Sequence, residues 1–429
     1  MQDKAFRMGV LNGVFFAVVM SVLQPGLVLS AFFLKLTNST SFATLPLALM
    51  RIGSLWPQLI VSNVAEARER KKPFYVIAAM ARVVFLSLMA FSTYLLGAKH
   101  TGLIVFLFPI LYFSYASGSG VCGIAFSDIV GKTIPATRRG KFMGTRGFLG
   151  GILGFGTGFY VKHMLSVSGP DFPTNYAWLF ATAAVFQTAT LLAFAAVPEP
   201  IVKVRKKRAS FREHLAQGAS ILKTDRDYRL LFAIRVLSSV GWIGSVVFIP
   251  YAIKSLGMPE SFVGVLIIIS TCFALPSNFV WSHISDKYGN RLLLLISTFM
   301  YLSVPIIATL SYYLPSYNFP LLGSYDLRVV VFIIAFTLSA ISMKGRGMGF
   351  MNYLLEISPE DKRPSYLAFM SVLLAPTVLV PLAGGIIAEL ISFQATFMLS
   401  FVFGLGAYVL MFRMSEPRNG YGKERDEGL

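Results

Sequence analysis

The sequence is poor in charged residues, which make up only 14% of its 429 positions. A soluble globular chain carries about a quarter. Mean hydropathy is +0.67, and the apolar residues gather in runs of about 20 or more, which is long enough for a helix to cross a hydrocarbon core about 30 Å thick. These features exclude a soluble protein and predict a polytopic helical membrane protein. The short alternating segments of a membrane β-barrel do not dominate.

Cysteine and histidine are scarce. The two cysteines, Cys122 and Cys272, both fall in apolar runs, so we expect neither a disulfide framework nor a cysteine metal site. The four histidines are scattered without the spacing of zinc ligands. We therefore predict no metal and no cofactor. Paired acids or histidines near one interface, which a lipid-modifying enzyme would need, are also missing, so we predict that the chain is not an enzyme and has no catalytic residue.

Acidic residues are the rarer sign of charge, and the net charge is +18. Most Lys and Arg residues fall in alternate loops, whereas the loops between them hold few, namely Lys35, Lys99, Lys162, Lys254 and Arg328. This is the positive-inside pattern, and it places both termini in the cytoplasm. We expect a multi-pass protein of the plasma membrane, the inner membrane in a bacterium. Nucleic-acid binding is not expected because no folded basic domain remains outside the membrane.

Hydropathy predicts twelve spans separated by a long connector. They lie near residues 8–34, 41–63, 74–97, 102–128, 147–167, 176–197, 230–253, 262–283, 292–314, 329–355, 367–390 and 393–413. The expected division is a six-helix bundle at 1–197, a cytoplasmic linker at 198–229, and a second six-helix bundle at 230–429 with a short cytoplasmic tail. The linker carries VRKKR at 204–208, which suits anionic headgroups of membrane lipids as well as a solvated loop.

The two halves repeat each other. The polar turn SHISDKYGNR at 282–291 has a blurred counterpart in SNVAEARERKK at 62–72, in which Glu66 stands for Asp286. Span 6 ends in Pro-Glu-Pro at 198–200 and span 12 in Glu-Pro at 416–417. Aligned turns after spans 4 and 10 place Asp128 on Asn352. Such repeats indicate a duplicated membrane protein.

Twelve spans in two halves, a long central inside loop and a D-K-x-G-x-R turn between spans 8 and 9 resemble the major facilitator superfamily. The family's turn is met at Asp286, Lys287, Gly289 and Arg291, with Ser282 in place of the first glycine, and it is degraded in the first half. The resemblance implies an all-α fold in which two six-helix bundles are related by a pseudo-twofold axis. We expect these turn residues, with Glu66 and Asp128, to act in gating, Asp286 facing the positive N-terminal end of a neighbouring helix. The alternative is a basic turn that only anchors topology.

Five cations are expected inside the spans, with no Asp or Glu at the same depth. They are Arg51, Arg82, Arg235, Lys344 and Arg346. A charge at a helix centre costs about 2.5–3.5 kcal/mol on insertion scales, so each needs a partner or a water-filled cavity. We expect an anionic substrate to supply the missing negative charge.

The superfamily resemblance implies that spans 1, 4, 7 and 10 line a central cavity and that spans 2, 5, 8 and 11 flank it. The candidate substrate contacts are Arg51, Lys344, Arg346, Arg235, Gln24 and Asn12. We expect only one of Lys344 and Arg346 to face one ligand, because residues two apart face different ways. Arg235 could instead snorkel to the inside surface, and Asn12 could make an interhelical hydrogen bond. Arg82 is expected to be structural.

The prediction is a monomeric secondary transporter that moves a small solute, an organic anion by the charge argument, by rocker-switch alternating access. A proton or a counter-anion is the possible coupling ion. The alternatives are an exporter of amphipathic or drug-like compounds and, from another class, a membrane sensor or scaffold that has lost transport.

Overall fold

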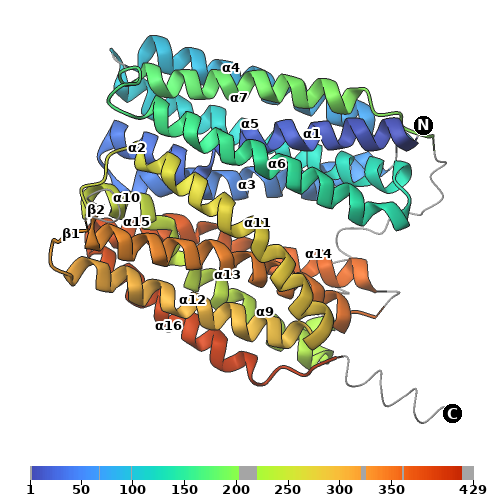
Figure 1. The fold of residues 1–429 in the computed structure, drawn as a ribbon. Coiled ribbons are helices and arrows are strands. Elements are labelled where there is room, and N and C mark those ends of the chain that lie inside the picture. The colour runs from blue at the N-terminus through green and yellow to red at the C-terminus, as the bar shows by residue number, and fades with distance from the viewer. Residues whose placement is uncertain are drawn as a thin grey trace. The chain divides into compact units, whose positions relative to one another are not determined.

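The computed structural model describes residues 2–66, 68–97, 99–201, 220–319, 325–359 and 362–417, and these are almost all helical (Figure 1). The chain forms two compact units. Unit 1 comprises Met1–Lys207 and Gly257–Thr271, and unit 2 comprises Arg208–Leu256 and Cys272–Leu429. The domain boundaries expected near residues 197 and 229 stay a prediction, because residues 202–219 lie outside the described part.

Unit 1 contains six helical spans, the first of which is interrupted. Its elements are α1 (Gln2–Val22), the π-helical turn η1 (Pro25–Leu29), α2 (Ser30–Thr37), α3 (Thr40–Glu66), α4 (Lys72–Leu96), α5 (Thr101–Thr133), α6 (Ala136–Met164) and α7 (Thr174–Ala195). The interruption follows from Pro25, which has no backbone N–H to donate. The N–H groups of Leu27 and Leu29 both bond to the carbonyl of Gln24, at 3.2 and 3.3 Å.

Unit 2 holds the second set of spans. Its elements are α9 (Arg226–Gly241), the 3₁₀ turn η2 (Trp242–Val247), α10 (Phe248–Lys254), α12 (Asn290–Tyr313), β1 (Asn318–Phe319), β2 (Tyr325–Asp326), α13 (Leu327–Ile357), α14 (Arg363–Leu373), the 3₁₀ turn η4 (Ala375–Leu379), α15 (Val380–Leu390) and α16 (Phe393–Met411). Helix α11 (Phe262–Tyr288) begins in unit 1 and continues into unit 2. The two short strands pair antiparallel.

Length and hydropathy agree with the predicted membrane fold. In the described part of the chain, nine helices are long and apolar enough to cross a membrane, or ten if α14 and α15, which bend by 44°, form one broken span. The other two expected spans coincide with α3 and α6, which are 27 and 29 residues long. The prediction of an all-α polytopic membrane protein is confirmed.

Three helix pairings recur in both units. In unit 1, α4 packs on α5 and α7, and α1 packs on α7. In unit 2, α12 packs on α13 and α16, and α9 packs on α16. In both halves, the third span therefore packs on the fourth and the sixth, and the first span packs on the sixth. This is expected of an internal repeat.

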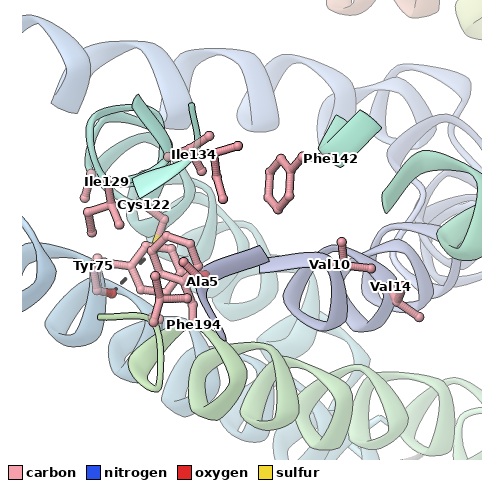
Figure 2. Close-up of a cluster of buried hydrophobic side chains, with 14 residues drawn as sticks. Ala5, Val10, Val14, Tyr75, Cys122, Ile129, Ile134, Phe142 and Phe194 are labelled. Carbon is pink, nitrogen blue, oxygen red and sulfur yellow. Dashed lines mark hydrogen bonds between the residues drawn. The ribbon is translucent and has the colours of Figure 1, made fainter. Parts of the chain in front are cut away.

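Aromatic and small side chains fill the interior of unit 1 (Figure 2). The rings of Tyr75 on α4 and Phe194 on α7 lie 4.1 Å apart between centroids. Beside them, the Cys122 thiol on α5 donates to the backbone carbonyl of Tyr75 at 3.7 Å. Phe142 on α6 is fully buried next to Gly9, where an added Cβ would lie 2.7 Å from the ring. The core thus joins α1, α4, α5, α6 and α7.

Candidate functional site

Arg82 is buried inside unit 1, with 2% of its surface exposed. Its Nη2 donates to the Tyr115 hydroxyl at 2.8 Å, and its guanidinium lies over the rings of Tyr115 and Phe16 at 4.7 and 5.2 Å. Its Nε has no hydrogen-bond partner in the described part of the chain. Gly118 leaves room for the side chain, because a Cβ there would lie 2.6 Å from Cγ of Arg82. The arrangement stabilises a cation with aromatic faces and not with a carboxylate.

Asn12 and Arg146 form a second polar group in unit 1. The Asn12 amide donates to the Tyr75 hydroxyl at 2.8 Å and to the Thr190 carbonyl at 3.0 Å. Its oxygen accepts from Nη2 of Arg146 at 3.3 Å, and the Arg146 guanidinium lies 4.3 Å from the Phe126 ring centroid. Asn12 is 1% exposed, so its amide joins α1 to α4, α6 and α7.

Arg51 and Gln24 occupy interior positions of the first two spans. Arg51 lies in the middle of α3 and is half-buried, and its carbonyl accepts from the Ser54 hydroxyl at 3.2 Å. Gln24 precedes the π-helical turn and is half-buried. An interrupted helix leaves backbone groups without intrahelical partners, so polar groups are available beside Gln24.

Arg346 is a buried cation of unit 2, with 7% of its surface exposed. Its guanidinium lies 3.9 Å from the centroid of the Tyr301 ring on α12. The Tyr301 hydroxyl donates to the Gly241 carbonyl at 3.1 Å and lies 2.9 Å from the Ser245 hydroxyl. Gly241 ends α9 at the 3₁₀ turn, and its carbonyl also accepts from Ser400. One tyrosine therefore joins the cation to the break in the seventh span.

Arg235 and Lys344 differ in burial. Arg235 on α9 is half-buried, and its guanidinium lies 5.5 Å from the Phe350 ring centroid. Lys344 on α13 is exposed, two residues from the buried Arg346. The opposite orientation of the two α13 cations agrees with the helical spacing.

Four arginines thus lie within helices without an ion pair. Among the residues that the structure describes, no carboxylate lies within ion-pair distance of Arg82, Arg146, Arg235 or Arg346. Cation–π contacts return about 0.5–2 kcal/mol each. A single contact, as at Arg235 and Arg346, returns less than the roughly 2.5–3.5 kcal/mol that a helix-centre charge costs on insertion scales. The positive charge of these two residues is only partly compensated within the described part of the protein.

The expected gating turn surrounds Gly289. This residue has a φ of +87°, and a Cβ added there would lie 2.7 Å from the Glu416 carboxylate. The carboxylate therefore lies against the positive N-terminal end of α12. Arg291, one residue into that helix, donates from Nη2 to the Phe412 carbonyl at 3.0 Å. A glycine is required at this position both by the left-handed backbone and by the close approach.

The first half carries an equivalent carboxylate. Oε1 and Oε2 of Glu199 accept from the backbone N–H groups of Lys71 and Lys72 at 2.7 and 2.9 Å, at the start of α4. Lys132 lies 3.5 Å from Glu199 and 2.5 Å from Asp128. The predicted gating residue Asp128 thus belongs to an ion-pair cluster that holds the ends of α4, α5 and α7 together.

The remaining predicted gating residues lie at the surface or outside the described part. Asp286 is exposed and accepts from the Ser282 hydroxyl at 3.5 Å. The Lys287 ammonium lies 5.2 Å from the centroid of the neighbouring Tyr288 ring. The side chain of Glu66 lies outside the described residues. The gating role of this set stays a prediction.

Arg146 was not among the cations predicted to lie within a span, because span 5 was expected to begin at residue 147. Helix α6 begins at Ala136, directly after Pro135 at its N-cap position. Proline is frequent at helix starts, so this residue was the signal that could have extended the helix and placed Arg146 inside it.

Comparisons with known proteins agree with this arrangement. Residues 231–428 match the family model of the Major Facilitator Superfamily. Uncharacterized proteins of Mycobacterium bovis and Mycobacterium tuberculosis are 26% identical over 183 residues. The matched stretch covers 42% of this chain and 35% of each relative, so the chain spans about a third of the length of the curated relatives it matches.

Solved transporter structures share the fold across nearly the whole chain. The nucleoside transporter NupG has a TM-score of 0.69 at 13% identity, over 96% of this chain and 99% of its own. A bacterial homologue of the iron transporter ferroportin has a TM-score of 0.67 at 12% identity, over 96% and 98%. The human organic anion transporter MFSD10 has a TM-score of 0.62 at 13% identity, over 96% and 99%. At these identities the likeness concerns the fold.

Proposed function

Because the chain belongs to the major facilitator superfamily, we propose that it is a secondary transporter that carries a small organic anion across the membrane. The observation that carries this proposal is the set of arginines buried or half-buried within helices, of which Arg146, Arg235 and Arg346 make no ion pair among the described residues. A negatively charged solute would complete the charge balance of such a protein.

The fold does not choose the cargo. The similar solved structures include a nucleoside transporter, a homologue of an iron transporter and an organic anion transporter. The cargoes of these transporters differ in charge, although each fold resembles this chain at a TM-score above 0.6. The cargo class therefore has to be argued from side chains, and here the charged side chains within the spans are cationic.

Arg346 is the strongest candidate for contact with the anion. Its guanidinium has a ring on one face and an Nε without a hydrogen-bond partner in the described part of the chain. The planar group offers donors in a fork that matches a carboxylate or phosphate. We assign Arg51, Arg235, Lys344 and Gln24 as further candidates. Asn12 is left out of the proposed contact set because its amide and carbonyl groups are already bonded within unit 1.

We further propose that transport follows alternating access, with the halves at 1–197 and 230–429 moving as two bodies. The turn at Asp286–Arg291 would act in gating. In the helices that the structure describes, the carboxylates lie close to helix ends, as Asp128 and Glu356 do. This favours a counter-anion over a carboxylate-borne proton as the coupling ion. The positive-inside pattern favours a plasma-membrane protein with cytoplasmic termini.

The test is a ligand-stabilisation screen of the purified full-length protein against anionic, neutral and cationic metabolites, followed by uptake into proteoliposomes. Arg346→Gln should weaken binding of the stabilising anion by 10- to 100-fold, or about 1.4–2.8 kcal/mol. The matched control is Arg138→Gln, because Arg138 is exposed, forms an ion pair with the exposed Asp3 and lies over the Phe6 ring. Transport of neutral or cationic solutes alone would exclude the anion proposal, and unchanged affinity in Arg346→Gln would remove that residue from the site.

A further inference from the structure

Unit 1 holds a second buried polar side chain besides Arg82 of α4. Gln187 on α7 is 0% exposed, and neither its amide nitrogen nor its oxygen has a hydrogen-bond partner in the described part of the chain. An unsatisfied buried amide is rare in native proteins and calls for an explanation. Arg82 has the same property at its Nε atom.

The register of α4 and α7 places these two side chains opposite each other. The helices lie side by side and run antiparallel, since the ring of Tyr75 near the start of α4 packs, tilted by 39°, on the ring of Phe194 near the end of α7 (Figures 1 and 2). At the other end, Gly97 adjoins Pro173 just before α7. Arg82 and Gln187 each lie seven residues from the Tyr75–Phe194 contact, at 75 to 82 and 194 to 187.

Seven residues correspond to about two helical turns, so they return to the same face of each helix. The faces that carry Arg82 and Gln187 are therefore the faces that bring Tyr75 and Phe194 together. We infer from this register that the two side chains lie at one level, and no hydrogen bond joins Gln187 to Arg82 in the described part of the chain. Both offer N–H donors, and one carries a full positive charge.

We propose that Arg82 and Gln187 bind a small inorganic anion of halide size inside unit 1, chloride being the candidate. The ion would accept from Nε of Arg82 and the amide nitrogen of Gln187. It would also supply the counter-charge that no described carboxylate gives Arg82. A water molecule would satisfy the donors but leave the buried charge uncompensated.

This inference goes beyond the proposed function. The ion would be a resident of unit 1, surrounded by Phe16, Tyr115 and Gly118. It stands whether or not the transported solute is an anion, and its test measures stability and not transport.

The test compares thermal unfolding of the full-length protein in chloride, bromide and gluconate at one ionic strength, so that general screening is constant. An ion that binds the folded state raises Tm with the logarithm of its concentration above Kd. Wild-type Tm should rise with chloride and bromide, but not with gluconate. Equal melting in all three salts would overturn the proposal.

Two substitutions of Gln187 separate the site from a general salt effect. Gln187→Leu removes the donor and should move the chloride dependence to at least 10-fold higher concentration. Gln187→Glu places a carboxylate opposite Arg82, so it should make Tm independent of chloride and high in gluconate. The matched control is Gln394, a half-buried glutamine of α16, whose Leu and Glu variants should keep the wild-type dependence.

Wild-type chloride dependence in both Gln187 variants would contradict the assignment. Anomalous scattering from crystals grown in bromide gives the location directly. A peak within hydrogen-bond distance of Arg82 and Gln187 is expected, and a water molecule without anomalous signal at that place would overturn the proposal.

Discussion

Replacing Glu199 with alanine removes the carboxylate that connects the chain after α7 to the start of α4. Its two oxygens accept from the Lys71 and Lys72 backbone N–H groups at 2.7 and 2.9 Å, and Lys132 lies 3.5 Å away. The side chain is only 2% exposed. Water therefore cannot readily take over the lost contacts.

The expected loss of unfolding free energy follows from these contacts. A hydrogen bond to a charged group contributes about 1.5–3 kcal/mol, and the helix-dipole interaction at the start of α4 overlaps with both bonds. Allowing for that overlap, we expect Glu199→Ala to lose about 3–5 kcal/mol, the range in which one partner of a buried charged pair is removed. Glu199→Gln keeps one acceptor oxygen and should lose about half as much.

The measurement is chemical unfolding of the purified protein in detergent, followed by tryptophan fluorescence, with Tm as a second readout. Asp3→Ala is the matched control, since Asp3 is 77% exposed and its ion pair with Arg138 is a surface pair. Surface pairs contribute about 0–1 kcal/mol. A Glu199→Ala variant as stable as Asp3→Ala would refute the role of this carboxylate.

Three further changes test other parts of the structure. Gly289→Ala should lose at least about 1–2 kcal/mol of unfolding free energy, because the φ of Gly289 is +87°. A lower Tm in calorimetry would show this loss. Tyr301→Phe should lose about 1 kcal/mol of unfolding free energy, because it loses the hydrogen bond to the Gly241 carbonyl. Its affinity for the anion should stay within threefold of wild type, whereas Tyr301→Leu should also change that affinity. Hydrogen bonds from Arg328 lower the pKa of the Asp326 carboxyl, so this stabilisation should be present above about pH 4 and decline as the pH falls below it; Asp326→Asn should flatten that part of a Tm-versus-pH curve.

Hydropathy and charge placement were enough to predict the membrane fold because lipid imposes length and polarity on every span. The repeat was also visible, since the carboxylates at 199 and 416 recur after the sixth and twelfth spans and take up matching places at the starts of α4 and α12. Both are signals that local sequence carries.

Interior contacts were harder to predict. The expected fifth span begins at residue 147, whereas α6 begins at Ala136 after Pro135, so Arg146 lies inside the helix but outside the expected span. The stack of Arg346 on Tyr301 and the unpartnered Gln187 depend on which faces of separate helices meet. Hydropathy gives the positions of helices along the chain but not their rotation about their axes.

In both halves a buried arginine lies on a tyrosine ring, but the two residues occupy opposite helices of the pair. In unit 1 the cation lies on the third span, at Arg82, and the ring on the fourth, at Tyr115. In unit 2 the ring lies on the third span, at Tyr301, and the cation on the fourth, at Arg346. Equivalent helix pairs thus reach one interaction from opposite directions.

In each half, a carboxylate that follows the last helix lies at the start of the third-span helix. Glu199 fastens the chain beyond α7 to the start of α4, and Glu416 lies where α12 begins. Cleavage of the chain between the halves would leave the contacts of Glu199 and of Glu416 intact. Each half should therefore keep its own carboxylate contact in a protein whose chain is cut after residue 207.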